Sequence, residues 1–162
     1  EVEELRENIF YFIKNLDEPS LSASNFYIVL LSYIEDLASD LDYIISKSYK
    51  HINNDHKKLK LSQIRDLNEI HEFTKSIFKD SMETFDNNSV AEIEILLNNR
   101  GKIKAQIQEK INSQIKLTRS TETSPKNTTL YFNILLKSKD IYKIKINLIE
   151  EFYNTYRKIN NR

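Results

Sequence analysis

The sequence predicts an all-α protein, an antiparallel bundle of long helices, and three observations support this prediction. The chain of 162 residues contains one glycine and two prolines. Sheets and mixed folds need frequent turns that draw on these residues, so few breaks indicate long elements. Hydrophobic residues make up 40% of the chain and recur at spacings of three and four, the period of a helix with one buried side. The length suits one domain, which we assign to residues 1–162.

The first two helices are expected on either side of a break at residues 17–20. Before the break, an apolar stripe runs from Leu5 to Leu16. The break contains Pro19, which suits the first turn of a helix and disrupts its middle. After it, spacings of four and three form an apolar seam with Ile52 extending the same side: Leu30, Ile34, Leu37, Leu41 and Ile44. A seam of this period packs against neighbouring helices at a shallow angle.

Three further helices are expected, which makes five in all. The third runs from about 61 to 85, and Ser89 with Glu92 forms a capping box at the start of the fourth. The fourth helix extends through residues 93–115 and contains Gly101, which we interpret as a point of close helix contact or a slight weakness.

The fifth helix is expected to begin at Ser124 and Pro125, an N-cap and a first-turn residue. The chain also repeats itself weakly around this start. An offset of 104 positions aligns identical residues, among them Ser20 with Ser124, Tyr27 with Tyr131, Leu31 with Leu135, and Asp36 with Asp140. We therefore expect an internal pseudo-repeat, two copies of one helical unit of which the second lacks its last helix.

Three runs of the sequence resemble the PhoU family, and in particular the PhoU-like regions at the C-terminus of bacterial sodium/phosphate cotransporters. The runs are YIEDLASDLDYI at 33–44, SYKHINNDHKKL at 48–59 and SPKNTTLYFNILLKSKDI at 124–141. Together with the duplicated bundle they extend the resemblance to essentially the whole chain. It implies a regulatory domain on the cytoplasmic face of the inner membrane that modulates sodium-dependent phosphate uptake.

The resemblance also implies partners. The chain begins with Glu1, and its helical pattern is already under way at Leu5, so we expect a segment of a longer protein. Its partner would then be its own upstream transmembrane transporter domain, or another membrane transport component. A homo-oligomer is compatible with this arrangement.

PhoU proteins carry an acidic motif in each repeat, Glu or Asp followed four residues later by Asp, whose carboxylates bind metal ions. The resemblance implies that Asp36 and Asp40 are the metal ligands here, on one face of a helix, and oxygen ligands of this kind suit divalent ions or iron. The second copy retains only Asp140, because Ile144 replaces one carboxylate and Lys139 stands beside the other. The arginine and glycine usual inside the motif are missing from both copies. We therefore expect a solvated acidic face and no resident cofactor.

Enzymes and nucleic-acid binders are disfavoured by composition and motifs. The chain has no cysteine, and it lacks the GxSxG, HExxH and P-loop patterns. It carries 24 Lys and Arg against 24 Asp and Glu, whereas a nucleic-acid-binding surface needs a basic excess. We predict neither catalysis nor a nucleic-acid partner.

Other polar clusters are expected to be structural. His51 and His56 would point about 140° apart on one helix, which suits a polar helix end better than a metal site. We expect His71 to be partly buried, and Tyr131 to lie at the rim of the bundle. The locally basic run Tyr142–Ile146 is expected to be a solvated face, with contact to an anionic membrane or an acidic partner as the alternative.

Two other functions remain open at this point. The chain could be a helical bundle that mediates oligomerisation or other protein interactions without any ligand. It could also be a free-standing PhoU-like regulator of phosphate signalling.

Overall fold

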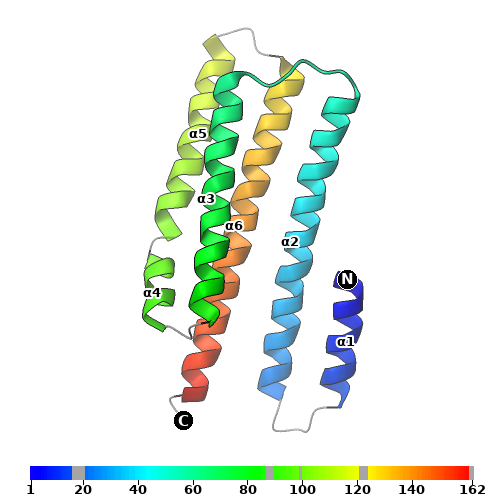
Figure 1. The fold of residues 1–162 in the computed structure, drawn as a ribbon, viewed down its shortest axis with the longest axis vertical. Helices are drawn as coiled ribbons and strands as arrows, with labels where there is room; N and C mark the ends of the chain where they lie inside the picture. Colours follow the sequence, from blue (N-terminus) through cyan, green and yellow to red (C-terminus); the bar gives the residue numbers. More distant parts are fainter. Residues whose placement is uncertain (16–20, 87–89, 99, 121–123, 161–162) are drawn as a thin grey trace.

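The computed structural model describes residues 1–15, 21–86, 90–98, 100–120 and 124–160, and these ranges contain no strand. They contain six described helical segments: α1 (Val2–Lys14), α2 (Leu21–Asn53), α3 (Leu61–Asp86), α4 (Val90–Asn98), α5 (Arg100–Ser120) and α6 (Pro125–Asn160). Consecutive long helices run in opposite directions along one axis (Figure 1). The predicted all-α antiparallel bundle is therefore confirmed.

Helix α6 is the centre of the bundle, with α2 on one side and α3, α4 and α5 on the other (Figure 1). Tyr131 and Leu135 of this helix have no exposed surface. The main core joins α6 to three neighbours and comprises Ile70, Ile93, Ile107, Ile111, Tyr131, Leu135, Tyr142, Ile146 and Ile149. Burial of one such side chain contributes roughly 1.5–3 kcal/mol, so this cluster holds the four helices together.

The apolar seam predicted for α2 is wrong at Leu41 and at its extension, Ile52. Leu41 is 50% exposed and Ile52 is 73% exposed, whereas Leu31, outside the predicted seam, is 4% exposed. The reason is the edge position of α2. Helix α6 packs along one side of it, and α1 lies beside only its N-terminal half (Figure 1).

The expected fourth helix is described as α4 and α5, and residue 99 between them lies outside the described residues. Gly101 is helical and belongs to the described segment α5. A Cβ atom built on Gly101 would meet nothing within 4 Å, so our interpretation of this glycine as a close helix contact is wrong.

The helix ends agree with the sequence where they are described. Helix α6 begins at Pro125, and the backbone N–H of Thr128 donates to the carbonyl of Ser124 at 3.0 Å. The break at 17–20 and the capping box of Ser89 and Glu92 lie outside the described residues and side chains. No helix within the described ranges combines the length and the apolar character needed to cross a membrane.

The internal pseudo-repeat stays a prediction. Of its aligned pairs, Leu31 and Leu135 are both buried. Tyr27 is half-buried, whereas Tyr131 is fully buried. The expectation that Tyr131 lies at the rim of the bundle is therefore wrong. Tyr131 is a core residue, because α6 has helices on both of its sides.

Candidate functional site

Two of the three predicted site residues meet at one lysine. Asp40 is 6% exposed on the side of α2 that faces α6, and Lys137 of α6 donates to its Oδ1 atom at 2.5 Å. The Oδ2 atom of Asp140 lies 3.9 Å from the same Nζ atom. The hydrogen bond to Asp40 is the main cause that raises the pKa of Lys137. Lys137 therefore stays positively charged between the two carboxylates.

The third predicted ligand, Asp36, is not part of this group. It is exposed one turn before Asp40. Within the described part of the chain, no group of three or more His, Cys, Asp or Glu side chains could hold a metal ion. The ammonium group of Lys137 supplies the positive charge that Asp40 needs, so a metal ion at Asp36 and Asp40 would have to displace it. Metal binding there stays a prediction.

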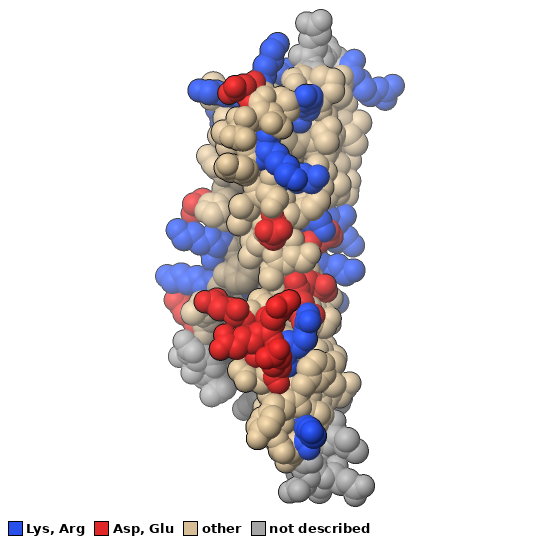
Figure 2. Space-filling view, turned by 90° about the vertical axis from the view of Figure 1, so that its right-hand side faces the viewer, with Lys and Arg blue, Asp and Glu red and all other residues tan. Residues whose placement is uncertain are grey.

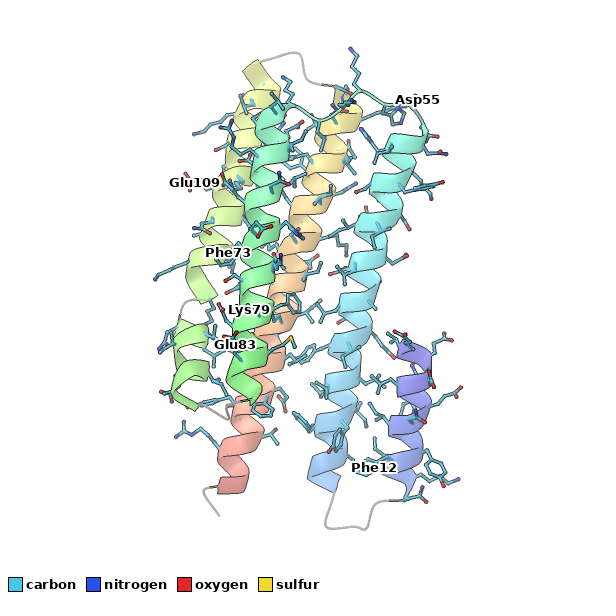
Figure 3. All side chains as sticks on the ribbon, viewed as in Figure 1. Phe12, Asp55, Phe73, Lys79, Glu83 and Glu109 are labelled. Carbon is cyan, nitrogen blue, oxygen red and sulfur yellow. The ribbon has the colours of Figure 1, made fainter. Side chains whose placement is uncertain are left out.

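The two histidines at the end of α2 lie closer together than expected. Their ring centroids are 5.1 Å apart, because His56 follows α2 and does not belong to it. Asp55, labelled in Figure 3, has a φ of 49° and turns the chain back toward the helix. Burial lowers the pKa of His56, and nearby Lys126 lowers it further. His71 is exposed, not partly buried as predicted, with 73% of its side chain in solvent.

Lys145 of α6 is a buried charge that the sequence did not reveal. It is 4% exposed, and its Nζ atom has no hydrogen-bond partner among the described residues. The Nζ atom lies 4.0 Å from the centroid of the Phe78 ring of α3. Burial lowers the pKa of Lys145 to about 7, against an opposing effect of Asp80. The expected solvated face at Tyr142–Ile146 is therefore wrong for Lys145, because these residues lie where α6 contacts α3 and α5.

A cavity of about 490 Å³ lies between α3, α5 and the Tyr142 side chain of α6. On its wall, Lys110 of α5 contacts Asp66 at 2.9 Å and Glu69 at 2.6 Å. The hydroxyl of Tyr131 donates to the other oxygen of Asp66 at 2.7 Å. Burial would lower the pKa of Lys110, but the hydrogen bonds to Glu69 and Asp66 outweigh it and the pKa is raised. These groups satisfy one another, so the network ties three helices together.

The outer side of α2 carries four exposed apolar side chains, which we call the α2 stripe. They are Leu41 (50% exposed), Ile45 (65%), Tyr49 (65%) and Ile52 (73%). Their spacings of four, four and three keep them within an arc of about 80° around the helix. Contiguous exposed apolar patches are uncommon on proteins that stay monomeric, and they mark surfaces that bind other molecules.

The α2 stripe continues the surface on which α1 packs. Phe12 of α1 meets Tyr27 of α2 edge to face, with ring centroids 5.3 Å apart (Figure 3). About two turns higher along α2, Arg6 of α1 pairs with Glu35 at 2.6 Å. Tyr27 and Ile45 have the same angular position on a helix, since 18 residues make five full turns. The part of α2 beyond α1 therefore presents the same side to solvent.

Opposite charges lie at the two ends of the α2 stripe. The N-cap and the first two turns of α1, beside the middle of α2, carry four exposed carboxylates: Glu1, Glu3, Glu4 and Glu7. Figure 2 views this side of the molecule and shows most acidic side chains gathered below a mostly tan area that also holds some charged side chains, with mainly basic side chains near the top. Three exposed lysines lie in the segment that follows α2 at the top: Lys57, Lys58 and Lys60.

Sequence patterns alone did not identify the α2 stripe as a surface. The sequence predicts Leu41 and Ile52 in a buried seam. Apolar spacing shows that one side of a helix is apolar, but it does not show which neighbour covers that side. Exposure of Ile45 and Tyr49 depends on where α1 stops along α2, which only the packing shows (Figure 1).

Comparisons with known proteins leave the family open. No protein-family model, no curated protein and no solved structure compared with this chain matches it. The resemblance to PhoU proteins consequently rests on the three sequence runs given above.

Proposed function

We propose that this chain is a non-catalytic interaction bundle that binds another protein through the α2 stripe. The single observation that carries the proposal is the row of four exposed apolar side chains that continues the α1-binding side of α2. Burial of each of these side chains against a partner would be favourable by about 25 cal/mol for each Å² of apolar surface removed from water. The side chains stand on a long helix that α6 holds in place, so the surface needs little ordering on binding.

Cross-linking in cells tests this proposal. A photoreactive amino acid is placed at Ile45 of the full-length native protein, and at Met82 of α3 as the control. Met82 is matched in exposure, at 66% against 65%, but lies on another helix. We expect ultraviolet light to produce a covalent adduct from position 45 and not from position 82. Equal yields at the two positions, or none at either, would contradict a binding role for the α2 stripe.

A narrower form of the proposal takes its partner from the resemblance to PhoU proteins. The chain would then regulate sodium-dependent phosphate uptake from the cytoplasmic face of the inner membrane, in contact with a transmembrane transporter component. This form is supported by the runs at 33–44, 48–59 and 124–141.

Fractionation of cells tests the narrower form. An antibody against this chain should detect the full-length native protein in carbonate-washed membranes, at a mass well above 19.2 kDa. Recovery in the soluble fraction at about that mass would contradict transporter attachment. An interaction bundle, or a free-standing PhoU-like regulator, would then remain as the proposed function.

A further inference from the structure

We propose that the α2 stripe binds the α2 stripe of a second copy of this chain, with the two α2 helices antiparallel. This inference rests on the proposed function and identifies the partner. Three features of the described residues support it: the spacing of the α2 stripe, its continuity with the α1 contact, and the distribution of charge at its ends.

The spacing of the α2 stripe is compatible with a two-fold axis. In an antiparallel pair with the axis between Ile45 and Tyr49, Ile45 of one copy meets Tyr49 of the other. Leu41 of one copy then lies level with residue 53 of the other, one residue beyond Ile52, so that all four side chains are covered in both copies. Such a self-complementary contact closes after two subunits and leaves no apolar side chain of the stripe in water.

The contact with α1 shows that this side of α2 accepts an antiparallel helix. Helix α1 runs opposite to α2 and packs on the side that contains Tyr27 and Glu35 (Figure 1). The α2 helix of a second copy would occupy the same side one step further along, with the same relative direction. The dimer would therefore extend an interface that already exists within the chain.

The distribution of charge favours a second copy of this chain as the partner and an antiparallel direction of the two α2 helices. A two-fold axis at the middle of the α2 stripe brings the acidic first turns of α1 in one copy toward the end of α2 in the other, where Lys57, Lys58 and Lys60 outnumber Asp55. Both ends of the interface would then be neutralised. A parallel pair would place like charges together at each end, which is unfavourable.

The size of the α2 stripe predicts a weak dimer. From residue 41 to residue 52 it is only about 17 Å long, at 1.5 Å for each residue. A stable interface buries about 800 Å² on each partner, and smaller contacts are typically transient. We therefore expect a dissociation constant on the order of 10 µM, which makes pairing sensitive to protein concentration.

Sedimentation velocity of the purified 162-residue chain tests for the dimer. Between about 1 and 200 µM, we expect the mass to rise from 19.2 kDa toward twice that value. Ile45→Asp should keep the chain monomeric throughout this range, and Met82→Asp should dimerise as the unchanged chain does. Both sites are exposed, so circular dichroism should show the same helix content for each variant. A monomer at 200 µM, or dimers of Ile45→Asp, would overturn the proposal.

Charge reversal tests the antiparallel direction. One variant carries Glu3→Lys and Glu4→Lys, and the other carries Lys57→Glu and Lys58→Glu. Each variant alone should dimerise at least several-fold more weakly, because side chains of like charge then face each other at both ends of the interface. An equimolar mixture should form mixed dimers with the original affinity, and failure of the mixture to recover would overturn the antiparallel arrangement.

Failure of this inference is distinguishable from failure of the proposed function. A monomeric chain whose position 45 still cross-links to another protein in cells would overturn the self-pairing and leave the interaction bundle in place. Absence of both the dimer and the adduct would contradict both proposals.

Discussion

Lys137 of α6 donates a 2.5 Å hydrogen bond to the carboxylate of Asp40 on α2, across the contact that joins these two helices. Asp40 is 6% exposed, so its charge has lost most of its contact with water and depends on this partner. The ring of Tyr43 also faces Lys137, with its centroid 5.4 Å from the Nζ atom. The pair therefore fixes the register of α2 against α6.

Removal of Lys137 should destabilise the chain strongly. Lys137→Met would leave the buried carboxylate of Asp40 without its partner, and we expect a loss of about 3 kcal/mol in the free energy of unfolding. The measurement is urea denaturation at pH 7. Asp36→Asn is the matched control, because Asp36 is exposed on the same helix, and it should change stability by less than about 0.5 kcal/mol. Equal effects of the two substitutions would show that the pair contributes no stability.

Metal binding at Asp36 and Asp40 should require the loss of Lys137. With the ammonium group in place, we expect Mn²⁺ or Mg²⁺ at 1 mM to leave the melting temperature unchanged. In Lys137→Ala, Asp40 and Asp140 lose their shared cation, and Mn²⁺ should then raise the melting temperature by a few degrees. Thermal denaturation with and without a chelator measures both effects. A rise in the unchanged chain that Asp36→Asn abolishes would instead support the metal site implied by the PhoU resemblance.

Gly101→Ala should stabilise the chain. A methyl group at this position has no neighbour within 4 Å and the residue is helical, so the substitution adds helix propensity without a clash. Alanine is favoured over glycine by up to about 1 kcal/mol inside a helix, and we expect a gain of about 0.5–1 kcal/mol. Urea denaturation checks the increase, and a loss of stability would show that the space around Gly101 is needed.

Local features of the chain were predictable from the sequence, since they depend on neighbouring residues. The scarcity of glycine and proline and the apolar period predicted the long helices, and Ser124 with Pro125 predicted the start of α6. The open space around Gly101 was an exception, because it depends on which helices pack nearby.

Contacts between distant segments were not predictable in the same way. Asp40 and Lys137 are 97 positions apart, and their pairing depends on the register of α2 and α6. Lys145 lies in a run where lysines alternate with apolar residues, and nothing in that run distinguishes it from exposed Lys143. The difference arises because α6 has neighbours on two sides, so even its polar positions are covered. The edge helix α2 shows the opposite effect, with apolar residues left in water.

Lys145→Met should stabilise the chain near neutral pH, and the gain should vanish at high pH. The folded-state pKa of about 7 lies below the usual 10.5, so folding disfavours the charged form. The resulting cost is complete below pH 7 and declines between pH 7 and 10.5, where the unfolded chain binds more protons than the folded one. Methionine removes the cost, and we expect a gain of about 1–3 kcal/mol at pH 6–7.

Lys143→Met is the matched control for this substitution, because Lys143 is exposed two residues earlier on the same helix. Urea denaturation of the three chains at pH 6, 7, 8, 9 and 10 gives the difference in unfolding free energy at each pH. All other titrating groups are the same in the three chains, including Asp80, the carboxylate that opposes the lowering of the Lys145 pKa. The difference for Lys145→Met should therefore fall with rising pH, while that for Lys143→Met stays near zero. A pH-independent gain for Lys145→Met would mean that better packing against Phe78, and not removal of a buried charge, stabilises the variant.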